Sequence, residues 1–274
     1  MHFITLSREL GSNGGKVAKK IADRLGYRLI DTAAIDEKAQ EMGFLKSVAE
    51  IDEKAPSFFR RVFSQQPNIN LVRLNSIIYE FGKQGDTVFV GRGGHILLRN
   101  FGCALHIRIT ASLETRIRNL VDRGYEKKSI EQVIEMSDRD RSGFMRFAFG
   151  VDWRDSRIYD LVLNTDKLGL NSVAEAVISV AQSRDIKDFS RQSLETLGRQ
   201  ALASRAEAAI LEAGVSFEIN TGVLVSVEES GKVQLSGFVY DEEAKVRAEE
   251  VVKKVKGIEG IVNQIQVLPQ DRHT

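Results

Sequence analysis

Three glycines and a lysine lie close together near the start of the chain, and these residue types suit phosphate binding. Gly11, Gly14 and Gly15 fall in the stretch 7–15, and Lys16 follows directly. Glycines let the backbone wrap an anion with successive N–H groups, and a following helix adds the positive end of its dipole. The stretch therefore predicts a phosphate-binding loop between a strand and a helix.

Small or charged polar residues also follow two later apolar runs. Asp31 and Thr32 come after one run, and Arg92 lies in a glycine-rich segment after another. In parallel sheets, ligands bind beyond the carboxyl ends of the strands, where such loops gather. We therefore expect these three residues to join the glycine loop in one site.

Arginines are frequent in the segment 129–154, at positions 139, 141, 146 and 154. Alternating charge along a helix is commonly only a solvated face. Arginines ahead of an aromatic, glycine-containing stretch also suit a mobile lid that places guanidinium groups on phosphates. The sequence leaves both interpretations open.

A scaffold of alternating strands and helices must position these residues. Strands are predicted at 3–6, 27–30, 87–90, 104–109 and 161–163, and helices at 16–25, 32–42, 44–54, 70–81 and 113–123. Ser172 and Glu175 form a capping box that predicts the start of a further helix, which runs to Val180. This alternation predicts an α/β fold, a parallel sheet with helices on both faces.

The sequence changes character after residue 185, where a polar linker is predicted at 186–200 between domains at 1–185 and 201–270. In the second domain we expect a helix at 203–213, a hairpin of strands at 223–227 and 232–239, and a last strand at 261–267. Asp241 and Gly257 predict the two ends of a helix at 242–256. The pattern indicates a small α+β domain.

Composition excludes several classes of protein. The chain has 274 residues, 42% apolar and 28% charged, which indicates a folded, soluble protein. A net charge of +1 gives no reason to expect nucleic acid as a partner, and no apolar run approaches the roughly 18 residues of a membrane span. No signal-peptide pattern precedes the first strand, so we expect a cytoplasmic protein. The four histidines and Cys103 lack metal-ligand spacing, and Cys103 is expected to be a buried hydrophobe.

Several motifs occur in order along the first domain: SRELGSNGG, ADRLGYRLIDTAAI, VFVGRGGHILL, DRDRSGF and VDWRDSRIYDLVLNT. With them the chain, from residue 4 to about 181, resembles the cytidylate kinase-like family, relatives of the P-loop nucleoside monophosphate kinases. The resemblance implies a transferase that binds a nucleotide, with ATP and Mg²⁺ as cofactors. It places the donor phosphates on Arg8, Gly11, Ser12, Asn13, Gly14 and Gly15.

The resemblance also implies the remaining roles. Asp31, Thr32, Arg92 and Asp140 would bind the acceptor, and Lys16, Arg139, Arg141 and Arg146 would act on the transferring phosphoryl group. No protein metal site is expected.

The sequence also departs from the family pattern. Gly14 stands in place of the phosphate-binding lysine, so Lys16 is taken as its substitute, and Val17 occupies the position of the usual hydroxyl. Glu37, Gly93 and Gly143 replace charged residues of the pattern. Each lost charge-assisted hydrogen bond is worth about 1.5–3 kcal/mol, and together the losses could abolish cytidylate recognition.

The C-terminal stretch 215–267, with GKVQLSGFVYDEEAKVRAEEVVKKVKGIEGIVNQIQV, resembles a BON domain. That resemblance implies a role in association or regulation. Lys253, Lys254 and Lys256 could bind anionic lipid, but we favour a homo-oligomer. Three hypotheses follow for the whole chain: a phosphotransferase for a nucleoside monophosphate or similar small acceptor, a nucleotide-binding regulator with little turnover, and a purely structural or interaction protein.

Overall fold

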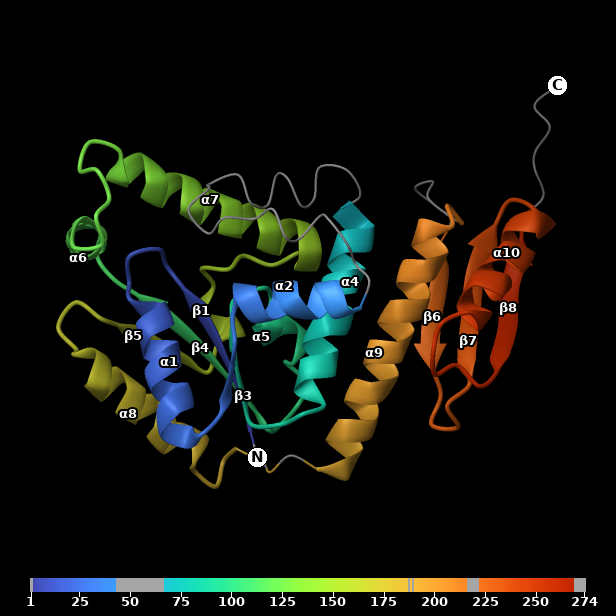
Figure 1. Cartoon of the computed structure of the whole chain (residues 1–274), viewed down its shortest axis with the longest axis horizontal. Coiled ribbons are helices and arrows are strands. Elements are labelled where there is room, and N and C mark those ends of the chain that lie inside the picture. Colours follow the sequence, from blue (N-terminus) through green and yellow to red (C-terminus); the bar gives the residue numbers. More distant parts are fainter. Residues whose placement is uncertain (1, 43–66, 187, 189, 216–221, 269–274) are drawn as a thin grey trace. The chain divides into compact units, whose positions relative to one another are not determined.

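The computed structural model describes residues 2–42, 67–186, 188, 190–215 and 222–268. The helix predicted at 44–54 lies outside these residues. The chain forms two compact units (Figure 1). The first comprises Met1–Ser64 and Gln84–Ser190, and the second comprises Gln65–Lys83 and Arg191–Thr274.

A five-stranded sheet of order β2-β3-β1-β4-β5 forms the centre of the first unit, and its recorded strand pairs are all parallel. The strands are β1 (Phe3–Arg8), β2 (Arg28–Ile30), β3 (Thr87–Val90), β4 (Ala104–Thr110) and β5 (Leu161–Asn164). Parallel strands bring their carboxyl ends to one edge. The segments that follow β1, β2 and β3 therefore meet there, as the sequence predicted.

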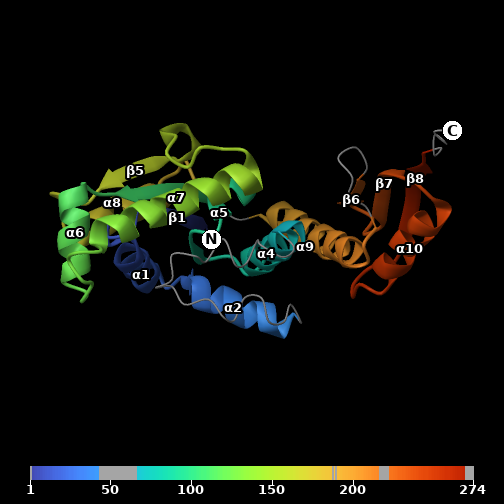
Figure 2. The same ribbon diagram turned by 90° about the horizontal axis from the view of Figure 1, so that it is seen from above.

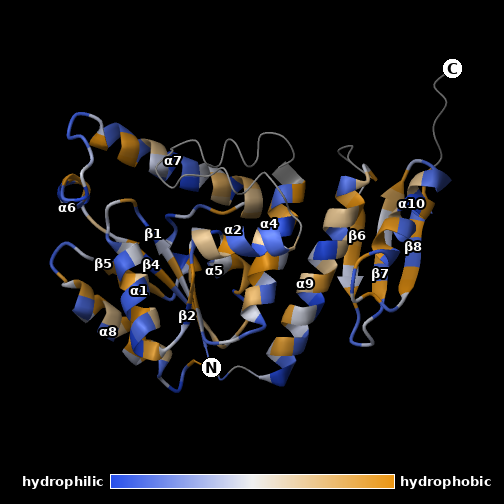
Figure 3. Ribbon diagram, viewed as in Figure 1, coloured by the Kyte–Doolittle hydropathy of each residue, from blue (hydrophilic) through white to orange (hydrophobic). Residues whose placement is uncertain are grey.

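Helices cover both faces of this sheet. They are α1 (Gly14–Leu25), α2 (Thr32–Glu41), α5 (Gly94–Leu97), α6 (Leu113–Val121), α7 (Ile130–Phe149) and α8 (Leu170–Ala181), with a 3₁₀ turn at Ser156–Ile158. Apolar residues of α1 and α8 pack with alternate residues of β1, β3 and β4 in one core, which Figure 3 shows in orange. The predicted α/β architecture is confirmed.

Helix α7 lies on the site side of this unit, along the edge where β1 and β4 end (Figure 2). Because it is one continuous helix of 20 residues, its arginines are distributed around it by the helical period. This placement decides which of the predicted lid residues reach the glycine loop.

The second unit joins α4 (Pro67–Gly82) and α9 (Arg191–Glu212) to a small sheet of order β6-β7-β8. Strands β6 (Val223–Val227) and β7 (Val233–Val239) are antiparallel, β8 (Ile261–Val267) pairs parallel to β7, and α10 spans Glu242–Lys253. Its core combines apolar residues of α9, α10 and the strands. A small α+β unit was predicted, and it is present.

Some predicted boundaries were wrong. Helix α9 starts at Arg191 and not near the predicted residue 203, so residues 191–200 are helical; Leu197 is the one buried residue among them, which is too few to show a period. The division into domains at 1–185 and 201–270 stays a prediction. Ser172 lies inside α8, whose N-cap is Gly169, so the capping box does not form. Helix α10 ends at Lys253, before the predicted Gly257.

Within the described part of the chain, no helix is both long and apolar enough to cross a bilayer.

Candidate active site

The loop between β1 and α1 has its carbonyl groups bound by protein donors. The Glu9 carbonyl accepts from the amide and the hydroxyl of Ser12, at 3.2 and 2.8 Å. The next three carbonyls accept from side chains: Leu10 from Arg116 Nε (2.7 Å), Gly11 from Asn119 Nδ2 (2.8 Å) and Ser12 from Thr165 Oγ1 (3.0 Å). Because protein donors bind these carbonyl oxygens, which are the negative ends of the peptide groups, the loop is organised to bind an anion.

The amides at the start of α1 are placed for that anion. Asn13 is the N-cap in a left-handed conformation (φ 61°), and Gly14 and Gly15 form the first turn. Among the described residues, no acceptor is recorded for the amides of these two glycines. Free N–H groups at a helix N-terminus favour a phosphate.

At two positions of the loop, neighbouring atoms lie so close that only glycine fits. A Cβ at Gly11, which has φ +85°, would lie 2.7 Å from the Arg116 carbonyl oxygen, and one at Gly14 would lie 2.5 Å from Cβ of Arg8. Gly15 has open space around it. The loop thus packs tightly at Gly11 and Gly14, and is open at Gly15.

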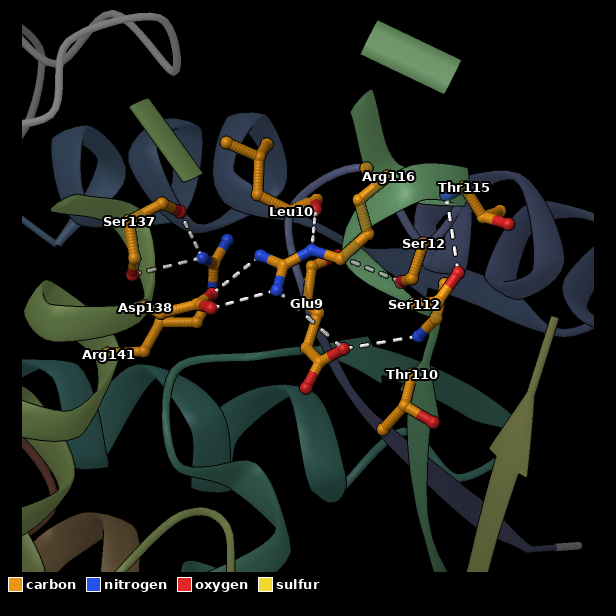
Figure 4. Close-up of polar contacts among 12 residues, drawn as sticks. Glu9, Leu10, Ser12, Thr110, Ser112, Thr115, Arg116, Ser137, Asp138 and Arg141 are labelled. Atoms are coloured by element: carbon orange, nitrogen blue, oxygen red, sulfur yellow. Dashed lines mark hydrogen bonds and ion pairs between the residues drawn. The ribbon is translucent and has the colours of Figure 1, made fainter. Parts of the chain in front are cut away.

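Arg116 of α6 connects this loop to α7 (Figure 4). Its guanidinium donates to both oxygens of Asp138, at 2.8 and 2.9 Å, while its Nε holds Leu10. Both side chains of the ion pair are largely buried, at 7% and 13% exposure. A bidentate pair of this kind fixes the orientation of both partners.

Glu9 supplies a second carboxylate beside the loop. It pairs with Arg108 of β4 at 3.0 Å, accepts from the Ala111 amide at 3.1 Å, and lies 3.9 Å from Arg116. The Arg108 guanidinium lies 4.8 Å above the ring of Trp153. These contacts hold the end of β1 against β4.

Arg141 lies on the same side of α7 as this network. Burial, together with the nearby positive charges of Arg8 and Arg116, lowers its pKa to about 10, against the opposing effect of the Asp138 and Asp140 carboxylates. Its guanidinium donates to the Ser137 carbonyl at 3.1 Å. Arg8, Arg116 and Arg141 thus form a cationic cluster next to the loop.

The other two lid arginines lie elsewhere on α7. Arg139 is 71% exposed and pairs with Glu135 one turn away at 2.7 Å, and Arg146 is also exposed. They line an open cleft of about 370 Å³, with Glu135, Asp138, Ser142, Gly143 and Arg154. The structure therefore groups Arg139 with Arg146 at this open cleft, and places Arg141 in the cationic cluster next to the loop.

Lys16, the predicted substitute for the missing lysine, lies on the first turn of α1. Its side chain is exposed, and no hydrogen bond or ion pair joins it to the described residues. The positive charges recorded near the loop come from arginines instead.

The predicted acceptor residues are partly brought together. Arg92, in a left-handed conformation (φ 58°), donates to Thr32 Oγ1 at 3.4 Å. Asp31 is the N-cap of α2 and accepts from the Ala34 amide at 3.2 Å. A Cβ at Gly91 would clash with the Arg8 guanidinium, so Arg8 lies between the glycine loop and this segment.

Reasoning from the sequence missed Glu9, Arg116 and the role of Asp138. Asp138 belongs to the DRDR motif, so a motif did mark its position, whereas Arg116 lies in a helix without any motif. Because Arg116 and Asp138 come from different helices, no spacing in the sequence pairs them.

Comparison with known proteins agrees with this architecture. A sequence model of the cytidylate kinase-like family matches residues 3–167, and the chain belongs to this family. A cytidylate kinase of Ignicoccus hospitalis is 28% identical over 183 residues, 65% of this chain and 97% of the relative. A cytidylate kinase of Pyrobaculum aerophilum is 29% identical over 177 residues, 62% of this chain and 88% of the relative.

The C-terminal part matches a model of the BON domain at residues 199–269. Among solved structures, an uncharacterized protein from Eubacterium ventriosum has a TM-score of 0.54 and 25% identity, and the alignment covers 67% of this chain and 99% of that one. The chain is thus a nucleotide kinase-like protein fused to a BON domain.

Proposed function

We propose that the chain is a cytoplasmic, ATP-dependent phosphotransferase for a nucleoside monophosphate, with CMP as the first candidate because relatives are named cytidylate kinases. One observation supports this proposal above all. A loop with all its carbonyls bound presents the amides of Gly14 and Gly15 beside the cluster of Arg8, Arg116 and Arg141.

The donor phosphates would bind the loop amides, and Arg8 and Arg141 would neutralise the charge that develops on the transferring group. Phosphoryl transfer depends mainly on positioning and electrostatic stabilisation, which is what a preorganised cationic cluster supplies. An acceptor phosphate is already a nucleophile, so the reaction needs no general base. Arg139 and Arg146 would act on the transferring phosphoryl group from the open cleft that they line.

The residues of the loop fit ATP better than they fit a protein-held metal. Val17, at the position of the usual hydroxyl ligand, is fully buried, and the Ser12 hydroxyl already donates to Glu9. No cluster of three metal-ligating side chains occurs in the described ranges. Mg²⁺ would therefore be held mainly by the nucleotide, where it supplies charge neutralisation to the phosphates.

Thr32, Arg92 and Asp140 would position the acceptor. The contact between Arg92 and Thr32 supports this role for both residues. Asp31 already caps α2, so its contribution to acceptor binding would be to hold Thr32 in place.

A second candidate function is nucleotide binding without turnover. Two observations favour it: Gly14 replaces the phosphate-binding lysine, and Lys16 is exposed and unpaired among the described side chains. In that case nucleotide binding would regulate the C-terminal unit.

Measuring ADP release from ATP with CMP, UMP, dCMP, AMP and GMP separates the two candidates. We expect one of the pyrimidine nucleotides to raise ADP release at least tenfold over ATP alone. ATP binding by calorimetry without release for any acceptor would instead support the regulator.

For the C-terminal unit we propose self-association. Leu224 (70% exposed) of the edge strand β6 and Phe238 (41% exposed) of β7 lie on the outer face of the small sheet. Leu224→Lys should lower the mass measured by light scattering. An unchanged mass in this variant together with co-sedimentation of the wild type with anionic vesicles would favour lipid binding instead.

A further inference from the structure

The C-terminal end of α7 packs against the segment 91–94, which carries the proposed acceptor residue Arg92. A Cβ at Gly93 would clash with the ring of Phe149, the last residue of α7. In Figure 2 this end of α7 lies beside α5, whose N-cap is Gly93. The ring therefore occupies the space that any side chain at position 93 would need.

The backbone that Phe149 contacts is a fixed turn at the end of β3. The Gly91 amide donates to the Leu6 carbonyl of β1 at 2.9 Å. Gly93 has φ 74°, and its carbonyl accepts from two amides of α5 at 2.9 and 3.1 Å. Arg92 lies between these two glycines and donates to Thr32. Phe149 is thus held next to residues that are proposed to bind the acceptor.

The ring of Phe149 is fixed on one side and keeps some exposed surface. It meets the ring of Phe144 edge to face, with the centroids 5.9 Å apart and the planes at 89°. Phe144 and Met145 are buried, at 5% and 4% exposure, whereas Phe149 is only half-buried. The core of α7 is therefore complete without the whole of this ring, and part of the ring can contact a ligand.

Helix α7 also connects this ring to the site of transfer. Arg141 and Phe149 are eight positions apart on one continuous helix, which is a rise of about 12 Å. Arg141 belongs to the cationic cluster beside the glycine loop, where the phosphoryl group would be transferred. An acceptor with its phosphate at that cluster would extend along α7 toward Arg92 and Phe149, and the base of a nucleotide is the end opposite its phosphate.

The chemistry at position 93 is aromatic and not ionic. Gly93 replaces a charged residue of the family pattern, and the ring of Phe149 fills its place. A charged side chain there could hydrogen-bond the edge of a base. An aromatic ring instead offers a π face, on which every base can stack.

We propose that Phe149 is a specificity-determining residue that stacks on the base of the acceptor. This role rests on the proposed function, and it selects a nucleoside monophosphate over a small acceptor that has no aromatic ring. Because stacking does not read the hydrogen-bonding edge of a base, Phe149 contributes similarly to the binding of pyrimidine and purine nucleotides.

Calorimetry of the full chain with CMP, AMP and ribose 5-phosphate tests this role. Phe149→Leu keeps an apolar side chain but removes the ring, so it should weaken CMP and AMP binding at least tenfold, by factors within threefold of each other. Ribose 5-phosphate has no base, so its affinity should stay within twofold of wild type, as should that of ATP at the glycine loop. Phe149→Tyr retains the ring and should bind CMP within threefold of wild type.

Phe147→Leu is the matched control, because it removes a ring from the same helix at a position that is 50% exposed. It should leave CMP binding within twofold. In steady-state kinetics, Phe149→Leu should raise KM for CMP at least tenfold and change kcat less than threefold, since stacking holds the ground state and the transition state alike.

Two results would overturn the role of Phe149 while the proposed function stands. One is CMP binding that is unchanged in Phe149→Leu, and the other is an equal loss for CMP and ribose 5-phosphate, which would mean that the ring only supports the turn. A wild type that binds ATP but neither CMP nor AMP would instead contradict the proposed function, and the stacking role with it.

Discussion

Replacing Asp138 with alanine tests whether the pair with Arg116 holds the site together. The substitution removes two hydrogen bonds of 2.8 and 2.9 Å and leaves the Arg116 guanidinium, 7% exposed, with Glu9 at 3.9 Å as its remaining carboxylate. Breaking a buried pair costs about 3–5 kcal/mol, and we take about 3 because Glu9 stays near. In a domain of this size, that corresponds to a fall in melting temperature of roughly 6–12 °C.

Thermal unfolding followed by circular dichroism measures this change. Glu135→Ala is the control, because it removes an ion pair on the same helix whose two side chains are 71% and 72% exposed. Exposed pairs one turn apart contribute about 0.3–0.5 kcal/mol, so the control should shift the melting temperature by at most about 2 °C. Equal shifts for the two variants would refute the view that Arg116 and Asp138 connect the loop to α7.

Three further predictions concern the loop, the lid and acid stability. Gly14→Val should abolish ATP binding in calorimetry because of the contact with Arg8, whereas Gly15→Ala, which has open space, should keep it; equal affinities would exclude the loop. Arg141→Ala should lower the turnover number more than tenfold, a barrier increase of at least about 1.4 kcal/mol, and Arg139→Ala should lower it less; the reverse order would place catalysis in the open cleft. Burial, together with His106, lowers the pKa of His95 to about 3, so between pH 6.5 and 3 the unfolded chain binds a proton that the folded chain does not. The free energy of unfolding must then fall as the pH falls. Measured by urea unfolding, it should decrease between pH 6.5 and 5 by about 1.6 kcal/mol more in wild type than in His95→Phe, which keeps a ring against Tyr159; parallel pH curves would contradict this.

Local patterns made much of the fold predictable. The strand, glycine loop and helix from Phe3 to Leu25 follow from apolar spacing and from glycines, and β3 and β8 have the predicted boundaries. Asp241 accepts from the Ala244 amide at 2.6 Å, as its N-cap position required. These features depend on residues within a few positions of one another.

Contacts between distant segments were not predictable in this way. The pairing of α4 with α9 joins residues such as Arg73 and Glu212, and nothing local marks either as a partner. In contrast, the separation of the lid arginines follows from the helical period, which puts residues seven apart on one face and residues two apart on nearly opposite sides. Arg139 and Arg146 accordingly share the open cleft, and Arg141 does not line it.

Transfer of a phosphoryl group from ATP to CMP is measured most directly by ³¹P NMR of the full chain with ATP, Mg²⁺ and CMP. The proposed function predicts that the γ-phosphate signal of ATP declines while signals of ADP and CDP appear, and that neither change occurs with Gly14→Val. An unchanged ATP spectrum in the presence of wild-type protein that binds ATP in calorimetry would contradict phosphoryl transfer to CMP. Equal transfer by Gly14→Val would contradict the assignment of the site to this loop.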